Sequence, residues 1–309
     1  MARVIHTGDT HIGYRQYHSE ERRQDFIDAF RQVIEDAISS EVDAVLHAGD
    51  LFHDRRPELQ DILATIEVLS DLQRAEIPFL AVVGNHEETR RIQWLDLFET
   101  LGLAERLDDR GRPVGNVTIY GQDYVPEARR DSLDYEFEDP DTPYTALVSH
   151  GRFEPFPYGT WDLEEVLSTT NLDFDAALLG DDHESKQKEI NGTWATYCGS
   201  TERASADERG ARGYNLVTFD GGVQISRRAL DTRNFVFIDL ELAPDEGEGR
   251  VRQRIREENV QDSVIVIRIE GDGDRIIPAD LEQFGNEQGA LLTRVRDRRE
   301  LKTDNEMSV

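Results

Sequence analysis

The stretch VLHAGDLFHD at residues 45–54 decides the fold of this chain. Its apolar run is short and stops at a glycine, and the carboxylate of Asp50 and the imidazole of His53 follow. This pattern predicts a short buried strand that ends in a tight turn carrying polar side chains.

The same pattern occurs at four other places in the chain. An apolar run stops, a small residue or a glycine follows in most cases, and Asp, Asn or His comes next. These turns are Gly8-Asp9-Thr10-His11, Gly84-Asn85-His86-Glu87, Ser149-His150-Gly151 and Gly180-Asp181-Asp182-His183. One such turn is ordinary turn chemistry, but five of them predict that five strand ends meet at one polar site.

Strands and helices are predicted to alternate along the first third of the chain. The predicted strands cover residues 2–6, 44–48 and 78–83, and the predicted amphipathic helices cover residues 19–37, 57–72 and 92–101. Ser19 suits the N-cap of the first helix, and Pro57 suits the start of the second. The alternation indicates an α/β fold with a parallel sheet.

The organisation of the sequence changes near residue 231. Residues 1–230 include further strands and antiparallel hairpins and form the predicted first domain. Residues 231–296 follow a strand, helix, strand, helix pattern and form a predicted smaller domain. Residues 297–309 form a predicted polar tail without a packing signal.

The composition is strongly acidic. Asp and Glu number 64 against 35 Lys and Arg, which gives a formal net charge of -29, and very few of the basic residues are lysine. Such a field repels nucleic acid at low salt, but at molar salt the Debye length falls to about 3 Å. We therefore interpret the acidity as adaptation to a salty cell interior.

The sequence predicts a cytoplasmic protein with no membrane contact. No apolar run is long enough to span a bilayer, and the N-terminus lacks the pattern of a secretory signal. The single cysteine, Cys198, excludes an intrachain disulfide and fits a reducing compartment.

The Asp, His and Asn side chains of the five turns suit Mn, Fe or Zn. A pair of divalent ions about 3.5–4 Å apart needs one carboxylate to bridge them, and Asp50 is the predicted bridge. The predicted ligands are Asp9, His11 and His183 for one ion, and Asn85, His150 and Asp181 for the other. His86 is left free to protonate a leaving alkoxide.

The order of these motifs resembles that of the calcineurin-like metallophosphoesterases. Three details narrow the resemblance to the Mre-eleven (SbcD-like) family of double-strand-break repair nucleases. They are the Tyr14-x-Gln16-Tyr17-His18 stretch, Asp-Leu-Phe-His at residues 50–53, and Gly199-Ser200-Thr201-Glu202-Arg203. The resemblance covers roughly residues 1–295.

The resemblance implies a two-sheet α/β sandwich flanked by helices, followed by a small α+β capping domain that helps to hold DNA. It implies 3'-to-5' exonuclease and single-strand endonuclease activity with two Mn ions per subunit. His53 would contact the scissile phosphate and His86 would serve as the acid. The family also implies a homodimer through helices near residues 59–72 and 92–101, and an SMC-like ATPase partner, Rad-fifty.

Two departures from the family pattern stand out. The family's last motif is Gly-His-x-His, whereas this chain has Gly180-Asp181-Asp182-His183, so a carboxylate replaces one imidazole. The family binds its ATPase through a segment after the capping domain, and we expect that segment to be missing or reduced here.

Several alternatives remain open at this point. Arg55, Arg56, Arg90 and Arg91 follow metal motifs and either contact DNA phosphates or form intramolecular ion pairs. The same core fits a phosphatase or another phosphodiesterase. The substitution at Asp181 also fits a non-catalytic subunit that binds or bridges DNA ends. His6 and His47 are interpreted as core histidines with satisfied hydrogen bonds.

Overall fold

The computed structural model describes residues 1–89, 91–133 and 135–299. The chain forms two compact units, Met1–Thr232 and Arg233–Val309. The boundary expected from the sequence, between residues 230 and 231, lies just before this division. Most of the tail expected from residue 297 onwards lies outside the described residues.

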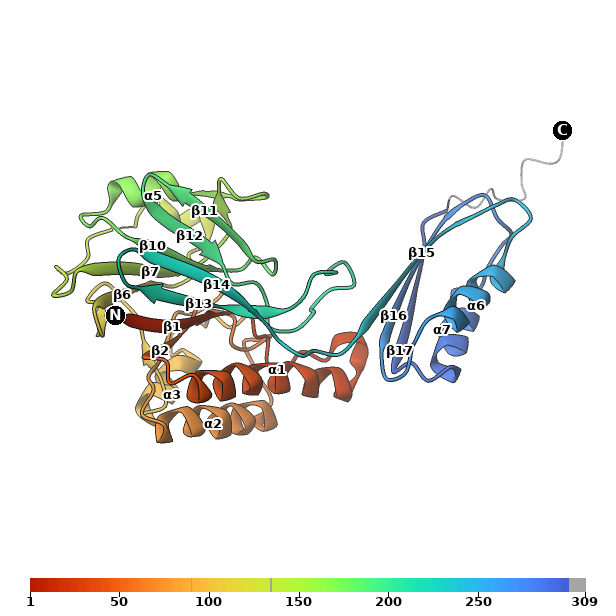
Figure 1. Cartoon of the computed structure of the whole chain (residues 1–309), viewed down its shortest axis with the longest axis horizontal. Helices are drawn as coiled ribbons and strands as arrows, with labels where there is room; N and C mark the ends of the chain where they lie inside the picture. The colour runs from red at the N-terminus through yellow and green to blue at the C-terminus, as the bar shows by residue number, and fades with distance from the viewer. Residues whose placement is uncertain (90, 134, 300–309) are drawn as a thin grey trace. The chain divides into compact units, whose positions relative to one another are not determined.

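The first unit contains two six-stranded sheets (Figure 1). The first sheet has the order β14 (Val223–Ala229), β13 (Gly213–Phe219), β1 (Ala2–Thr7), β2 (Ala44–His47), β3 (Phe79–Ala81) and β4 (Glu105–Arg106). The second has the order β11 (Lys186–Ile190), β12 (Thr193–Tyr197), β10 (Ala176–Gly180), β7 (Tyr144–His150), β6 (Val117–Gln122) and β5 (Arg112–Val114). The central strands β1, β2 and β3 are parallel, as are β10, β7 and β6.

The main core lies between the two sheets. Successive side chains of a strand point to opposite faces, so Val4 of β1 packs toward the second sheet while Ile5 packs toward the helices. Helices α1 (Glu20–Ser39), α2 (Leu59–Arg74) and α3 (Trp94–Thr100) lie on the outer side of the first sheet (Figure 1). The expected two-sheet sandwich flanked by helices is therefore confirmed.

Short elements complete this unit. They are η1 (Gln16–His18), α4 (Glu127–Arg130), α5 (Leu163–Thr169), and the pair β8 (Phe153–Glu154) and β9 (Trp161–Asp162). Ser19 caps α1 as predicted, because its side chain accepts a hydrogen bond from the Arg22 amide. The predicted start of α2 at Pro57 is wrong. The helix begins at Leu59 behind a capping box in which Glu58 and Asp61 bond each other's backbone amides.

The second unit alternates strands and helices, with three parallel strands in the order β15-β16-β17. Its elements are β15 (Phe235–Leu242), α6 (Glu248–Glu257), β16 (Val264–Gly271), α7 (Pro278–Glu287) and β17 (Leu292–Asp297). The first four correspond to the pattern expected from the sequence, and β17 was not predicted. The second unit has a small core of its own, which includes Val251, Ile267 and Leu281.

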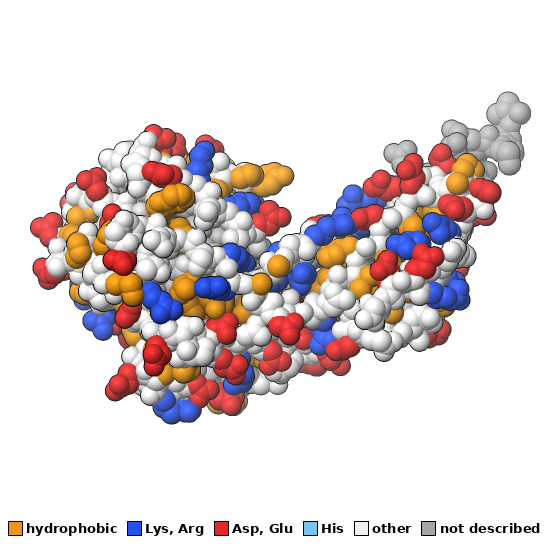
Figure 2. All heavy atoms as spheres, viewed as in Figure 1, with side chains coloured by type: hydrophobic (Ala, Val, Ile, Leu, Met, Phe, Trp, Pro, Cys, Tyr) orange, Lys and Arg blue, Asp and Glu red, His pale blue; other side chains and the backbone are white. Residues whose placement is uncertain are grey.

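Acidic side chains are spread over the visible face of both units, with arginines between them (Figure 2). Many of the arginines form exposed ion pairs with acids, such as Arg15 with Glu20 and Arg74 with Asp71. Among the described residues, no helix combines the length and apolar character needed to cross a bilayer.

The two histidines expected in the core are both fully buried. His47 bonds Thr10 Oγ1 through Nε2 at 3.1 Å. Neither ring nitrogen of His6 makes a hydrogen bond of good geometry within the described part of the chain, although the backbone of Leu179 lies near enough to favour the protonated ring. Burial, helped by the charge of Arg227, lowers the pKa of His6 to about 3.

This buried histidine makes the fold sensitive to acid. The unfolded chain protonates His6 near pH 6.5 but the folded chain near pH 3, so stability is lost as pH falls through this window. We expect His6→Leu to remove the loss of stability that is due to His6. The free energy of unfolding of the variant relative to wild type should rise by about 1.4 kcal/mol per pH unit below 6.5. Urea unfolding of metal-free protein at pH 7.5 and pH 5 measures it. An equal difference at both pH values would contradict the assignment.

Candidate metal centre

Every predicted ligand lies at or just after the carboxyl end of a strand. Strand β1 leads to Asp9 and His11, β2 to Asp50, and β3 to Asn85, all in the first sheet. Strand β7 ends at His150, and β10 leads to Asp181 and His183, in the second sheet. The two sheets thus bring side chains from sequence positions 9 to 183 to one edge of the sandwich.

The turns after the strands hold unusual backbone conformations. Asp9, His11, Asp50 and Asp181 all have positive φ, of 49°, 44°, 56° and 91°. Residues other than glycine adopt this region rarely and at a cost, and such strain is common at functional sites. The side chains that follow from these left-handed turns lie close together, Asp9, His11 and Asp50 in the ligand groups and Asp181 beside His150.

Two glycines allow the loops to approach closely. A Cβ on Gly84 would lie 2.1 Å from Asp50 Oδ1, and one on Gly180 would lie 2.1 Å from the Ala48 carbonyl oxygen. Only glycine fits such contacts. The glycines before Asn85 and Asp181 are therefore a packing requirement of the site itself.

One ligand group consists of Asp9, His11 and His183, whose ligand atoms lie within 4.8 Å of one another. The Nε2 atoms of His11 and His183 face each other at 3.0 Å. His183 Nδ1 donates to Glu208 Oε1 at 2.8 Å, which directs Nε2 inward. A carboxylate behind a histidine is the usual support of a metal-binding imidazole.

A second group consists of Asp9, Asp50 and His150, again within 4.8 Å. His150 Nδ1 donates to the Ala48 carbonyl at 2.7 Å, so Nε2 points into the site. There it faces Asn85 Oδ1 at 2.9 Å, Asp50 Oδ2 at 3.5 Å and Asp181 Oδ1 at 3.8 Å. Asp50 Oδ2 also lies 3.9 Å from His11 Nε2. Asp50 therefore faces a histidine of each group, and Asp9 belongs to both groups, so the two groups are joined by carboxylates.

The electrostatics of the site call for cations. Burial raises the pKa of Asp9 to about 7. Burial alone would lower the pKa of His150, but the carboxylates of Asp50, Asp181 and Asp9 raise it to about 9. Burial alone would also lower the pKa of His183, but the hydrogen bond to Glu208 and the nearby carboxylates raise it to about 9. Without metal, protons on the histidines balance the buried carboxylates. The mixed carboxylate, amide and imidazole donors fit two divalent ions, which would release those protons on binding.

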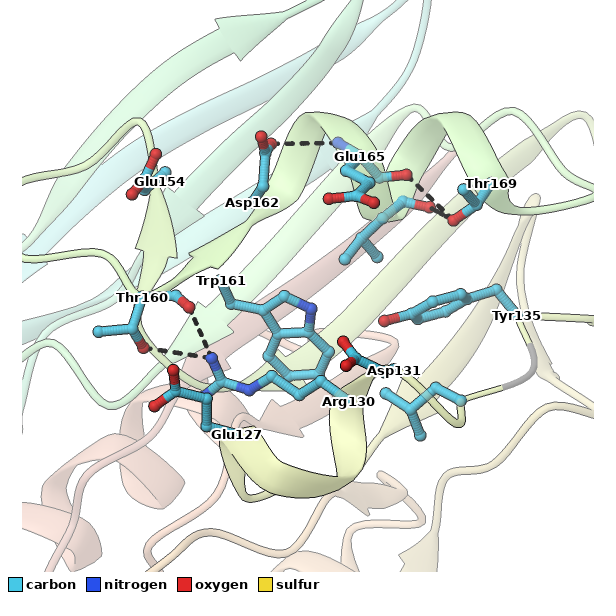
Figure 3. A pocket seen from close by; sticks show the side chains of 12 residues that line it. Glu127, Arg130, Asp131, Tyr135, Glu154, Thr160, Trp161, Asp162, Glu165 and Thr169 are labelled. Carbon is cyan, nitrogen blue, oxygen red and sulfur yellow. Dashed lines mark hydrogen bonds between the residues drawn. The ribbon is translucent and has the colours of Figure 1, made fainter.

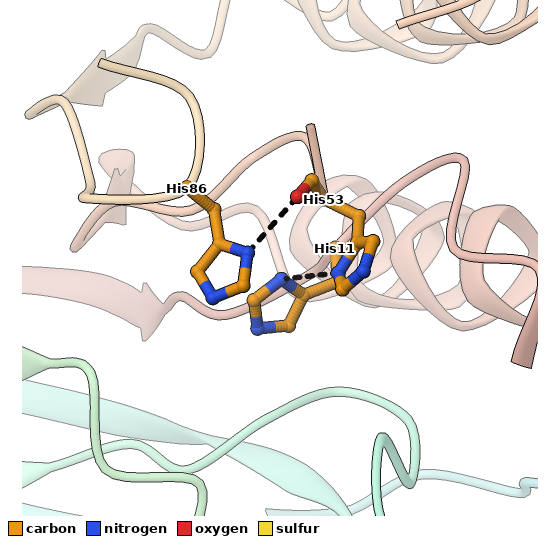
Figure 4. Close-up of side chains that lie close together, drawn as sticks. All are labelled: His11, His53 and His86. Carbon is orange, nitrogen blue, oxygen red and sulfur yellow. Dashed lines mark hydrogen bonds between the residues drawn. The ribbon is translucent and has the colours of Figure 1, made fainter. Parts of the chain in front are cut away.

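His53 and His86 lie beside His11 (Figure 4), and they are half-buried and exposed, whereas His11 is buried. The His86 amide donates to Asp50 Oδ1 at 2.9 Å, and its Nδ1 donates to the His53 carbonyl at 2.9 Å. The His53 ring stacks on Tyr14 with centroids 3.9 Å apart. Both imidazoles are thus oriented by their neighbours at the rim of the ligand groups.

Of the four predicted DNA-contacting arginines, Arg90 lies outside the described residues. Arg55, Arg56 and Arg91 are exposed, and none of them forms an ion pair with any residue that the structure describes. Arg56 lines a hollow of about 280 Å³ together with His53 and Tyr14. Arg55 lines a larger one of about 840 Å³ together with Tyr124, whose ring contacts His150.

A separate hollow of about 520 Å³ contains none of the predicted site residues. It is lined by acids such as Glu127 and Asp162, and Arg130 occupies it by stacking its guanidinium 4.6 Å from the Trp161 ring centroid (Figure 3). We therefore place the functional site at the strand ends.

Comparison with known proteins agrees with this arrangement. Residues 2–185 match the calcineurin-like phosphoesterase family. The DNA double-strand break repair protein Mre11 of Halobacterium salinarum is 60% identical over 98% of this chain and 79% of its own length. The protein of the same name from Haloferax volcanii is 56% identical over 100% of this chain and 70% of its own length. The chain belongs to the Mre11 family of calcineurin-like phosphoesterases.

Membership of the Mre11 family makes the chain a phosphodiester hydrolase with a divalent dimetal centre. The similarity to two halophilic archaea agrees with the salt-adapted composition. A dimetal phosphatase from Danio rerio, 12% identical, superposes with a TM-score of 0.50 over 74% of this chain and 96% of its own, which shows the shared fold.

The sequence analysis did not identify three supporting residues. Glu208 lies in a polar loop and carries no motif. The buried Glu87 accepts the Phe52 amide at 3.1 Å and the Gly84 amide at 3.3 Å, and so joins the turns after β2 and β3. Its place in Gly84-Asn85-His86-Glu87 was a signal that could have been used. Tyr14, which supports His53, was noted only as part of the family pattern.

Proposed function

We propose that this chain is a manganese-dependent DNA nuclease of double-strand-break repair, with 3'-to-5' exonuclease and single-strand endonuclease activity. One observation carries the proposal. Two ligand groups share Asp9, Asp50 faces a histidine of each group, and two further imidazoles, His53 and His86, stand beside them. A phosphodiester bound at this edge would contact both the ligand groups and the imidazoles.

We propose that Asp9, His11, Asp50 and His183 hold one ion, and that Asp50, Asn85, His150 and Asp181 hold the other. Bound divalent ions would polarise the phosphate and lower the pKa of water, as in other two-metal sites. Four carboxylate or amide donors beside three imidazoles favour Mn²⁺ over softer ions.

The imidazoles have distinct roles in this proposal. Burial and the nearby His86 lower the pKa of His53 to about 4, so His53 is neutral at pH 7 and orients the phosphate by hydrogen bonding. His86 is exposed, and its backbone amide is fixed to Asp50 Oδ1. We propose that His86 is the general acid that donates a proton to the leaving alkoxide.

DNA is the proposed substrate despite the acidic surface. Arg55, Arg56 and Arg91 have no acidic partner among the described residues, in contrast to most arginines of the chain, so they are available to phosphates. At molar salt the repulsion from the remaining acids is screened within about 3 Å. We expect DNA binding to require high salt, because the acidic protein needs it to screen its own charges. We also expect the bound DNA to have few of its phosphates neutralised.

We also propose a homodimer through α2 and α3, and an SMC-like ATPase of the Rad-fifty type as partner. Leu63 on α2 is 56% exposed. Leu59 on the same helix is 70% exposed and Ile92 before α3 is 74% exposed. Apolar side chains this exposed are suited to burial against a second copy.

The test of function is an assay on four substrates in molar KCl with Mn²⁺. They are end-labelled duplex DNA, hairpin DNA, a chromogenic phosphodiester and a phosphomonoester. We expect cleavage of both DNAs that EDTA stops, and little turnover of the monoester. Preferential hydrolysis of the monoester would indicate a phosphatase, and DNA binding without cleavage would indicate a bridging subunit.

Asp181→His tests the departure from the family pattern. Asp181 Oδ1 faces His150 Nε2, and its backbone amide donates to Asp9. If Asp181 is a working ligand, we expect the substitution to lower Mn²⁺ affinity by roughly 10-fold or more and to shift metal preference toward Zn²⁺. Isothermal titration with both ions measures the change. A large gain in Mn²⁺-dependent cleavage would show instead that Asp181 is a handicap.

A further inference from the structure

Three imidazoles gather beside the ligand groups, and of these only His11 belongs to one of the groups that contain Asp9. His11, His53 and His86 each offer one ring nitrogen, and these atoms all lie within 4.8 Å of one another (Figure 4). The Nδ1 atoms of His11 and His53 are 3.4 Å apart. The ring centroids of His86 and His11 are 4.8 Å apart, and those of His86 and His53 are 5.1 Å apart.

The spacing of the His11 and His53 nitrogens is close to that of two ligands on one metal ion. Two nitrogens on a tetrahedral ion with bonds of about 2.0–2.1 Å stand about 3.3 Å apart. The His11–His53 distance already matches this value. The His86 nitrogen, within 4.8 Å of the other two, has to approach by up to about 1.5 Å, within the reach of an exposed side chain.

His11 has two sides in this arrangement. Its Nε2 faces His183 at 3.0 Å, within the proposed dimetal centre, whereas its Nδ1 faces His53. The three-histidine cluster is therefore distinct from the ligand groups that contain Asp9 and Asp50, although it borrows one ring from them.

We propose that His11, His53 and His86 form an inhibitory site for an imidazole-preferring divalent cation of the Zn²⁺ class. Three nitrogen donors without a carboxylate favour Zn²⁺ over Mn²⁺, which is the weaker binder in the first-row series and prefers oxygen. Binding of the cation at this site does not depend on the proposed nuclease function, whereas inhibition of DNA cleavage rests on that function.

Occupation of this site removes both rim imidazoles from catalysis. A ring nitrogen bound to the cation can neither hydrogen-bond the phosphate nor transfer a proton to the leaving oxygen. The cation also draws His11 away from the dimetal centre, because a neutral ring cannot give both nitrogens to metals at once. Excess Zn²⁺ therefore inhibits even with Mn²⁺ present.

The binding test uses Zn²⁺ alone, in the Asp50→Asn background that lacks the shared carboxylate. Isothermal titration compares this variant with versions that also carry His53→Asn, His86→Asn or His18→Asn. His18 is exposed and outside the cluster, so its substitution is the matched control. Urea unfolding without metal shows that each variant is folded, as expected for exposed or half-exposed positions.

We expect the Asp50→Asn protein to bind one equivalent of Zn²⁺. Loss of one imidazole at residue 53 or 86 should weaken that binding by at least about 100-fold, more than the loss of a supporting outer group costs. The His18→Asn version should bind as tightly as the parent. Absent Zn²⁺ binding in the parent, or equal affinity in all versions, would overturn the proposal.

Activity provides a second, separate arm. With wild-type protein cleaving DNA in Mn²⁺, added Zn²⁺ should inhibit, and a chelator selective for Zn²⁺ should restore cleavage. Unchanged cleavage with the site filled would overturn the inhibitory role. A wild-type protein that cleaves no DNA in any metal would refute the proposed function, while the titrations would still report on the three-histidine site.

Discussion

Asp50→Asn is expected to abolish Mn²⁺ binding at the dimetal centre and DNA cleavage together. The Asp50 carboxylate faces a histidine of each ligand group, since Oδ2 lies 3.9 Å from His11 Nε2 and 3.5 Å from His150 Nε2. Loss of an outer-sphere partner costs about 10–100-fold in metal affinity. Loss of the shared ligand should exceed about 1,000-fold in activity, because both ions depend on it.

The substitution leaves the local structure intact. The Asn side chain keeps the oxygen that accepts the His86 amide, and it has nearly the same volume. Asn also tolerates the left-handed backbone at this position, where φ is 56°. The metal-free variant should therefore unfold at the same urea concentration as wild type, or a higher one, because one buried negative charge is gone.

Stability measured with and without Mn²⁺ separates metal binding from catalysis. At 100 times the dissociation constant, each bound ion stabilises the folded state by about 2.7 kcal/mol. Wild type should show this gain in urea unfolding, and Asp50→Asn should not. A variant that retained the Mn²⁺-dependent gain but lost cleavage would show that Asp50 acts in the reaction without holding metal.

The positions of the site residues could largely be predicted from the sequence. Each central strand is an apolar run that stops where its ligand begins, because a buried strand has to end before a polar side chain can enter the site. Asp9, Asp50 and His150 are examples. The parallel arrangement of the strands in each sheet then places their carboxyl ends together, which makes the convergence a consequence of the α/β pattern.

Other features could not be read from local sequence. The Glu208 carboxylate reaches His183 from a loop that is ordered by Arg212 and Ala204, so only the tertiary structure reveals it. The left-handed turns at Asp9 and Asp50 follow from backbone bonds between their loops, such as the Asp9 amide to the Gly49 carbonyl. Local propensity opposes this conformation, and tertiary packing overrides it.

Charge also concealed elements of the fold. Strand β17 reads LTRVRD, and half of its positions carry charge, so its apolar period is weak. It is specified by its pairing with β16.

On α2, Leu63 has the spacing of a core residue but faces outward, because the helix buries Thr65 and Val68 instead. Periodicity identified the helix without fixing its inward face.

His86→Asn is expected to keep both Mn²⁺ ions and lose about 10²–10⁴-fold in kcat on DNA, the usual contribution of a general acid. The backbone amide that bonds Asp50 remains, so the ligand groups are undisturbed. Titration with Mn²⁺ should give wild-type stoichiometry, and His18→Asn, at an exposed position outside the ligand groups, should cleave at the wild-type rate.

The chromogenic phosphodiester decides the role of His86. This substrate releases nitrophenolate, which leaves without being protonated. Loss of the acid should therefore slow its hydrolysis far less than it slows the release of the alkoxide from DNA. We therefore expect the activity of His86→Asn to fall much less on the chromogenic substrate than on DNA. An equal loss on both would mean that His86 binds the phosphate, as His53 is proposed to do, and that the proton reaches the leaving oxygen by another route.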